Sequence, residues 1–197
     1  MNKSVLAAIG GVAALVVAVV GYKAWSIHRE AAKWSGPMQE IAEEKIEHDQ
    51  NVTKSRFVSI IDAPMDKVLP VMWNVENLQQ TVPNFKLSKL IEANGNTKRL
   101  EISIQALTLP TLNYEMEFTL HPEEHRVTFK TLKSQAQDIE GEYRLEASPD
   151  GTKTKLEYIT IAKDKIAVPF PQSVLDSAGR ETYVNTVRGL QKQIKKG

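Results

Sequence analysis

The nine residues that begin at Leu112, LNYEMEFTL, alternate strictly between apolar and polar side chains. Successive side chains of a β-strand point to opposite faces of its sheet, so this alternation predicts a strand with one buried and one solvated face. The side chains on the predicted buried face are Leu112, Tyr114, Met116, Phe118 and Leu120. A chain that contains such a segment needs a sheet, and it needs a second apolar layer that covers the sheet.

Six strand-like runs follow one another between Pro83 and Asp164, with turn residues between them. The predicted strands are residues 84–92, 97–107, 112–121, 125–132, 137–147 and 153–163. Short connections join neighbours into antiparallel hairpins. A further strand is predicted in SRFVSIIDAP, and two short helices are predicted in MDKVLPVMWNVENLQQTVP. The sequence therefore predicts an antiparallel sheet of about seven strands.

The last segment, PFPQSVLDSAGRETYVNTVRGLQKQIKKG, has the periodicity of one long helix. Its apolar face is made by residues at helical spacing, Leu175, Gly179, Tyr183, Val187, Leu190 and Ile194. This helix is the one large apolar partner that the chain offers to the sheet. We therefore expect an α+β fold in which a curved antiparallel sheet wraps around the C-terminal helix.

The N-terminus carries an uncharged apolar run over residues 5–21, followed by Tyr22 and Trp25. A helix of this length matches the hydrocarbon thickness of a bilayer, and the two aromatic residues suit its interface. We predict a membrane anchor over residues 1–25, which makes the protein a single-pass membrane protein; its sidedness stays open. A cleaved signal peptide is the alternative, but its apolar region is shorter and ends in a small-residue cleavage site.

Residues 26–52 are polar and rich in glutamate, with a weak apolar stripe at Met38, Ile41, Ala42 and Ile46. Ser35, Pro37 and Glu40 suit the first turn of a helix. We predict a charged helical linker over residues 26–52 and a folded domain over residues 53–197.

Three segments carry a resemblance to a known family: FVSIIDAPMDKVLPVMWN, GEYRLEASPDGTKTKLEY and AVPFP. Together with the order of elements, they resemble the SRPBCC superfamily, which includes the polyketide cyclase/dehydrase and START-like domains. This resemblance implies a helix-grip fold with a deep apolar cavity between the sheet and the C-terminal helix. Members use such a cavity for lipids, quinones, hormones or polyketide intermediates.

Tyr114, Tyr143 and Tyr158 fall on predicted inward strand faces, and Tyr183 falls on the inward helix face. Buried phenols could fix a ligand in an apolar pocket, or they could be core residues bonded to one another or to the backbone. The predicted ligand-binding residues are Tyr114, Met116, Phe118, Phe129, Tyr143, Tyr158, Leu175, Gly179 and Tyr183.

Other chemistry finds little support in the sequence. The chain has no cysteine, and its net charge of +1 argues against nucleic acid as the main partner. HPEEH at residues 121–125 lies in a predicted hairpin turn, where its two histidines would not converge on a metal. Asp138, Glu140 and Glu142 share a predicted solvent face with Arg144, and Lys130, Lys133, Lys153 and Lys155 could pair with these carboxylates. We predict no catalytic residue, no metal site and no cofactor.

The resulting hypothesis is a membrane-tethered binding or carrier domain for a hydrophobic small molecule, lipid-like or isoprenoid-like. One alternative is an enzyme of the cyclase or dehydratase type that acts on a polyketide-like substrate. Another is a protein-interaction module whose cavity is filled by its own side chains. The sequence leaves the ligand and the oligomeric state open.

Overall fold

A computed structural model describes residue 34 and residues 36–167 and 169–196. The chain divides into two units, Met1–Pro37 and Met38–Gly197, and the second contains the whole sheet. The predicted anchor over residues 1–25, with its apolar run at 5–21, lies outside the described residues. Within the part of the chain that is described, no helix is long and apolar enough to cross a membrane.

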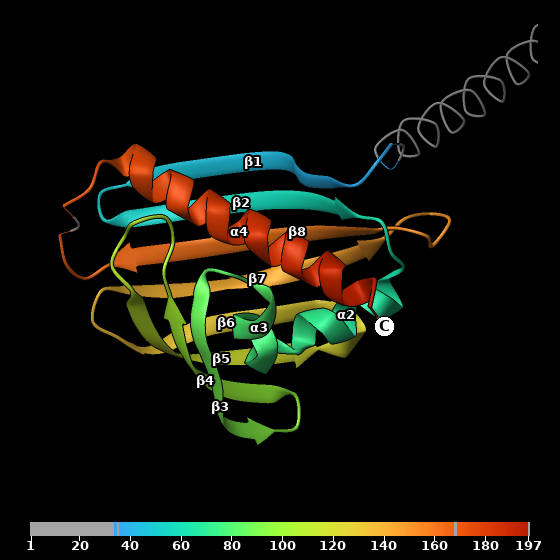
Figure 1. The fold of residues 1–197 in the computed structure, drawn as a ribbon, viewed down its shortest axis with the longest axis horizontal. Coiled ribbons are helices and arrows are strands. Elements are labelled where there is room, and N and C mark those ends of the chain that lie inside the picture. The colour runs from blue at the N-terminus through green and yellow to red at the C-terminus, as the bar shows by residue number, and fades with distance from the viewer. Residues whose placement is uncertain (1–33, 35, 168, 197) are drawn as a thin grey trace, which may run out of the picture. The chain divides into compact units, whose positions relative to one another are not determined.

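The domain contains one antiparallel sheet in the order β1-β2-β8-β7-β6-β5-β4-β3 (Figure 1). The strands are β1 (Gln39–Asp49), β2 (Val52–Ile61), β3 (Phe85–Asn94), β4 (Thr97–Ile104), β5 (Leu112–His121), β6 (Arg126–Ser134), β7 (Gln137–Ala147) and β8 (Thr154–Asp164). The six runs predicted between Pro83 and Asp164 are β3 to β8, which confirms the meander. The sheet has eight described strands instead of about seven, because β1 was not predicted.

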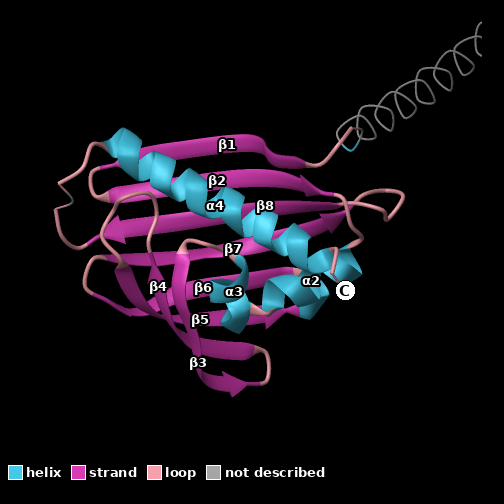
Figure 2. Ribbon diagram, viewed as in Figure 1, coloured by secondary structure: helices cyan, strands magenta, loops and turns pink. Residues whose placement is uncertain are grey.

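The helices lie on one face of this sheet (Figure 2). Helix α2 (Met65–Trp73), the 3-10 turn η1 (Val75–Asn77) and helix α3 (Leu78–Thr81) follow β2. This confirms the two short helices that were predicted before Pro83. Helix α4 (Gln172–Ile194) crosses the sheet, and α2 packs beside its C-terminal end. A curved sheet that holds a long C-terminal helix is the helix-grip arrangement.

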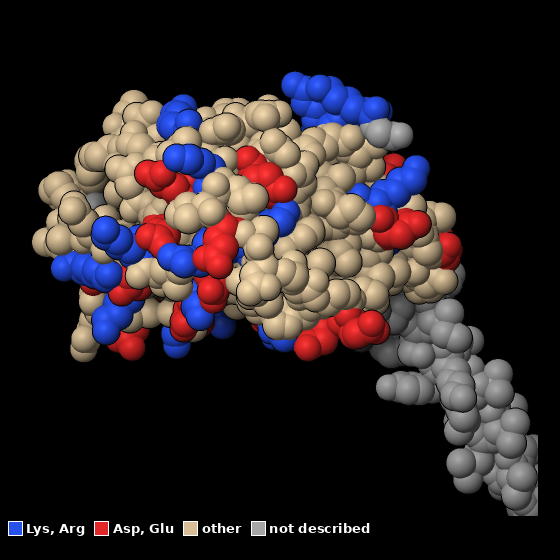
Figure 3. All heavy atoms as spheres, turned by 90° about the horizontal axis from the view of Figure 1, so that it is seen from below, with Lys and Arg blue, Asp and Glu red and all other residues tan. Residues whose placement is uncertain are grey.

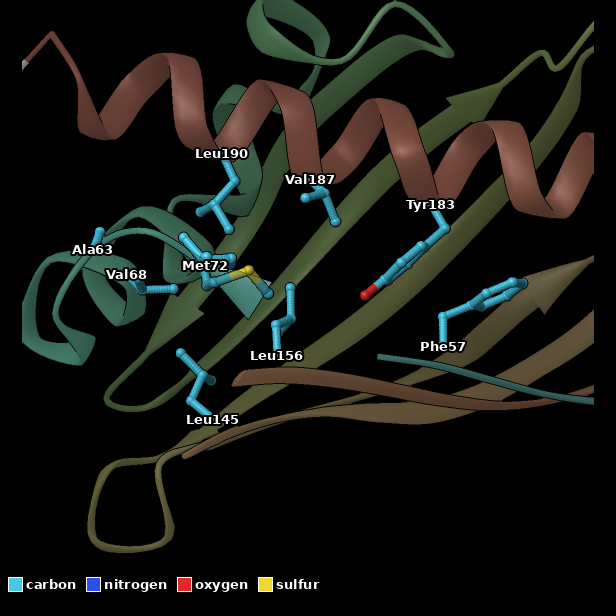
Figure 4. Packing of buried hydrophobic residues seen from close by; sticks show 10 residues of the cluster. Phe57, Ala63, Val68, Met72, Leu145, Leu156, Tyr183, Val187 and Leu190 are labelled. Atoms are coloured by element: carbon cyan, nitrogen blue, oxygen red, sulfur yellow. The ribbon is translucent and has the colours of Figure 1, made fainter. Parts of the chain in front are cut away.

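The core beneath the C-terminal half of α4 is dense and apolar (Figure 4). Val187 and Leu190 point from α4 toward the sheet, where they meet Leu156 of β8. Met72 and Val68 of α2 close the same cluster from the side. Val187, Val68 and Leu156 are completely buried, so this cluster fixes the helix over the sheet.

The helical linker predicted over residues 26–52 is wrong for Gln39–Asp49, because these residues form strand β1. Strand β1 pairs with β2 at Gln39 and, after a register shift, over Glu43–Asp49, so the sheet begins before residue 53. An acidic segment with four weak apolar positions has little to gain from a helix in isolation. The free edge of β2 supplies backbone hydrogen bonds instead, and this tertiary pairing overrides the local helical preference.

Glu40, Glu44 and His48 of β1 hold helix α4 by a ladder of ion pairs and hydrogen bonds. Glu40 accepts hydrogen bonds from Arg188, with 2.7 Å between Oε1 and Nε, and Glu44 accepts from Arg180, with 2.9 Å between Oε2 and Nε. His48 Nε2 lies 3.2 Å from Asp176 Oδ1. Glu44 and His48 are four positions apart in the regular part of the strand, so their side chains share one face, whereas Glu40 lies in the irregular stretch between Gln39 and Glu43. The ladder therefore runs along α4 from Arg188 to its first turns.

The opposite face of the sheet is charged, as the alternation predicts. Asp138 pairs with Lys165 at 2.6 Å and Glu142 with Arg126 at 3.1 Å. Lys130 pairs with Glu117 of β5 at 2.9 Å and not with the β7 carboxylates that the sequence suggested. Acidic and basic side chains are also interspersed on the side of the molecule that Figure 3 shows, which is turned by 90° from the view of Figure 1. The segment HPEEH forms the β5–β6 turn, with the 3-10 turn η2 (Pro122–Glu124) at its centre.

Candidate ligand-binding cavity

A cavity of about 510 Å³ lies between the inner face of the sheet and the helices. Each of the eight described strands contributes at least one residue to its lining, and α2, α3 and α4 contribute to its walls. Its lining is mainly aliphatic and aromatic. A volume of this size falls within the range of small-molecule sites, which is about 300–1,000 Å³.

All nine residues that the sequence nominated line this cavity. Tyr114, Met116, Phe118, Phe129 and Tyr183 are buried, whereas Tyr143, Tyr158 and Leu175 keep part of their surface accessible and Gly179 is exposed. The structure thus brings together residues from four strands and one helix. Contact with a ligand stays a prediction.

Six aromatic side chains form a connected series across the sheet floor. The ring centroids of Tyr143 and Tyr158 are 4.8 Å apart, and those of Tyr158 and Tyr183 are 5.5 Å apart. Phe57 stacks on Tyr183 at 4.8 Å, a contact that sequence reasoning missed. Ring pairs at these separations attract beyond their buried area. The series consists of Phe118, Phe129, Tyr143, Tyr158, Tyr183 and Phe57.

The tyrosine hydroxyls differ in their partners. The Tyr183 hydroxyl lies 2.6 Å from Ser59 Oγ, and Figure 4 shows it pointing from α4 toward the sheet. Tyr114 donates to Gln137 Oε1 at 2.8 Å. Tyr143 makes no side-chain hydrogen bond with any described residue, although its ring packs on Tyr158 and Phe129. An unpaired phenol at a cavity wall is free to bond with a bound molecule or water.

Burial raises the pKa of all four cavity tyrosines, and it raises that of Tyr158 to about 12. A tyrosine in the unfolded chain ionises near pH 10, so its neutral form stabilises the fold fully below about pH 10. That stability is lost as the pH rises through the folded pKa. An ultraviolet absorbance titration should therefore show Tyr158 ionising near pH 12. Ionisation of every tyrosine near pH 10, with an unchanged circular dichroism spectrum, would contradict this environment.

The cavity reaches the surface beside the N-terminal half of α4. The β4–β5 loop contributes Leu109 and Pro110 to the lining, and the segment before α4 contributes Ile166 and Phe170. Ile166 is 56% exposed, which places an apolar side chain in solvent at the edge of the cavity. The β4–β5 loop and the segment before α4 therefore both border the opening.

Gly179 of α4 borders open space. A β-carbon built on Gly179 meets no atom within 4 Å other than its own helix and neighbours, and the residue lines the cavity. Gly189 on the same helix behaves differently, because its β-carbon would lie 2.6 Å from the carbonyl oxygen of Thr81. Gly179 therefore leaves room at the cavity, whereas Gly189 permits a close approach between α4 and α3.

Sequence reasoning missed the polar residues of the lining, among which are Gln137 and Asp164. Gln137 Nε2 donates to Asp164 Oδ1 at 3.1 Å. The two residues are opposite each other in the β7–β8 register. Strand alternation could have found them, because Asp164 shares a face with Tyr158, and Gln137 with Tyr143. Among the residues that the structure describes, no group of three metal-ligating side chains gathers.

Residues 61–182 match the model of a family described as polyketide cyclase / dehydrase and lipid transport. This match spans more than half of the sequence. The chain belongs to this family. No curated protein matches the sequence.

Solved structures support the same fold at low sequence identity. The Zhui aromatase/cyclase from Streptomyces sp. R1128 is 13% identical, with a TM-score of 0.65 over 74% of this chain and 94% of its own. A STAR-related lipid transfer protein from Xanthomonas axonopodis is 14% identical, with a TM-score of 0.55 over 77% of this chain and 98% of that one. A START superfamily protein from Mycobacterium smegmatis is 11% identical, with a TM-score of 0.57 over 73% of this chain and 97% of that one. At these identities the likeness establishes the fold alone.

Proposed function

We propose that this family member binds and carries a hydrophobic small molecule in the cavity beneath α4. The observation that carries the proposal is the unfilled, mainly apolar cavity of about 510 Å³ with its aromatic floor. An interaction module with a filled cavity would not leave this space. The ligand would be held by apolar contact along the floor, and it would enter beside Gly179, where the lining reaches the surface.

A membrane tether at residues 1–25 is part of the proposal, and it rests on the sequence. An apolar ligand is concentrated in the bilayer, and a tether holds its binding domain close to that reservoir. This gain is one of effective concentration, and it needs no new contact. The lipid-like or isoprenoid-like nature of the ligand is proposed on the same basis.

Substitution of Gly179 by leucine tests the cavity directly. The new side chain has room and improves helix propensity, so the fold should be retained while the opening is filled. We expect the affinity for the neutral fluorescent probe N-phenyl-1-naphthylamine to fall at least about tenfold, since several apolar contacts are replaced. The measurement is a fluorescence titration of the full chain in a fixed detergent.

Ser177→Leu is the matched control, because it adds the same side chain to an exposed position of α4 that does not line the cavity. The N-terminal segment is identical in the wild-type protein and in both variants. A difference in their probe affinities therefore reports on the cavity. Equal probe affinity in Gly179→Leu and Ser177→Leu would refute the proposed site. Mass spectrometry of small molecules extracted from the same preparations should find less bound material in Gly179→Leu.

A cyclase or dehydratase is the second candidate, and one observation favours it. Two carboxylates, Asp164 and Asp176, line the cavity and could serve as acid–base groups. Asp176 is already held by His48 and Gln172. Conversion of a poly-β-ketone substrate that is abolished by Asp164→Asn would favour the enzyme, whereas release of unchanged extracted ligand would favour the carrier.

A further inference from the structure

We propose that the cavity contains a polar subsite at Tyr114, Gln137 and Asp164 that binds an uncharged or cationic hydrogen-bond donor on an otherwise apolar ligand, namely an alcohol or an amine. The inference rests on the proposed function, because it concerns the polar end of the same ligand. It adds a selection by head group: carboxylates are expected to be disfavoured.

The three side chains form a directed chain of hydrogen bonds along the cavity wall. Tyr114 donates its hydroxyl proton to Gln137 Oε1 at 2.8 Å, and Gln137 Nε2 donates to Asp164 Oδ1 at 3.1 Å. The two bonds fix the orientation of the Gln137 amide, with its oxygen toward the phenol and its nitrogen toward the carboxylate. All three residues line the cavity.

Both ends of this hydrogen-bonded series, Tyr114 and Asp164, have an oxygen that can accept a further hydrogen bond. The one proton of the Tyr114 hydroxyl is used, so its oxygen can only accept a further bond. Asp164 Oδ2 makes no hydrogen bond or ion pair with any described residue, while Oδ1 is bonded to Gln137. The backbone of Asp164 is fixed separately by Asn51, whose Nδ2 donates to its carbonyl at 2.8 Å. A held carboxylate with a free oxygen is complementary to a donor.

The charges of the cavity lining also favour a hydrogen-bond donor over an anion. Asp164 and Asp176 are the charged side chains among the described residues of the wall, and both are acidic. Asp176 has its oxygens engaged, since His48 Nε2 lies 3.2 Å from Oδ1 and 3.3 Å from Oδ2. With no lysine or arginine in the described lining, an anionic head group would meet a carboxylate without a counter-charge. A phosphate or carboxylate head group is therefore disfavoured by repulsion and desolvation.

A matched series of probes tests the subsite: dodecylamine, dodecanol and dodecanoate, each competing with N-phenyl-1-naphthylamine on the full chain in the same detergent. The tails are identical, so differences report on the head group. We expect the amine and the alcohol to compete at least about tenfold better than the carboxylate, because each can donate a hydrogen bond to the Asp164 carboxylate and the carboxylate probe cannot. Dodecanoate competing as well as the other two would overturn the inference.

The substitution Asp164→Asn tests whether the head-group preference comes from the Asp164 carboxylate. The amide oxygen of the new asparagine can still accept the hydrogen bond from Gln137. The hydrogen-bonded series is therefore kept while the negative charge at residue 164 is lost. We expect the advantage of dodecylamine over dodecanoate to fall about tenfold, with little change in Asp62→Asn, which removes an exposed carboxylate that does not line the cavity. An equal fall in both variants would indicate a diffuse acidic field and overturn the subsite.

The two hypotheses fail in different ways. If the neutral probe binds and responds to Gly179→Leu but no head-group preference exists, the subsite fails and the carrier proposal stands. If no probe binds at the cavity, the carrier proposal fails first. A thermal melt of each variant verifies that it is folded.

Discussion

Replacement of Gly141 by alanine is expected to lower the free energy of unfolding by about 3 kcal/mol. A β-carbon at this position of β7 would lie 2.2 Å from the carbonyl oxygen of Ile159 and 2.8 Å from Cζ of Phe129. The first of these atoms belongs to the backbone of β8, which is paired on both sides and cannot move aside. The strand would have to shift, and its hydrogen bonds to β8 would be strained. Denaturant unfolding of the full chain measures the loss.

Gly179→Ala is the control for Gly141→Ala, because it makes the same chemical change in open space. Removal of a glycine from a helix interior should raise stability by about 0.5–1 kcal/mol. The two substitutions should thus have opposite signs. If Gly141→Ala left stability unchanged, the close approach between β7 and β8 would be refuted.

Truncation of Leu156 to alanine is expected to cost about 3 kcal/mol. Leu156 is completely buried at the centre of the core beneath α4, where it meets Val187 and Met72 (Figure 4). Its strand lies between β2 and β7, so the space that is left cannot collapse easily. Thermal or denaturant unfolding measures the change.

Leu175→Ala is the comparison for Leu156→Ala, since both remove the same atoms. Leu175 borders the cavity and is only half-buried, so its truncation enlarges a space that already exists. We expect a cost of about 1 kcal/mol, which reflects the lost apolar burial alone. Equal losses at the two positions would mean that the cavity is not open beside Leu175.

Most strands and the long helix of this fold could be predicted because local sequence patterns specify them. Alternation located β5 and β7, and the periodicity of Leu175, Tyr183 and Val187 located α4 and its buried face. The same periods placed nine residues at the cavity. Strand alternation and helical periodicity were therefore enough to predict the fold and these nine residues of the cavity lining.

The rest depended on partners that are distant in the sequence. Strand β1 looked like a solvated helix because its glutamates bind Arg180 and Arg188, which come about 140 residues later. The pairing of Gln137 with Asp164 follows from a strand register that no single segment contains. Likewise, Gly141 is required by Phe129 and Ile159 on neighbouring strands, and nothing beside it in the sequence reveals this.

The ion-pair ladder between β1 and α4 has a mechanical consequence. Strand β1 is the first strand of the domain, and its side chains hold the helix that roofs the cavity. A load applied to the chain before Gln39 would act first on this edge strand, and through Glu40 and Glu44 it would reach α4. The first strand of the domain and the helix that roofs its cavity are thus linked directly by side-chain ion pairs.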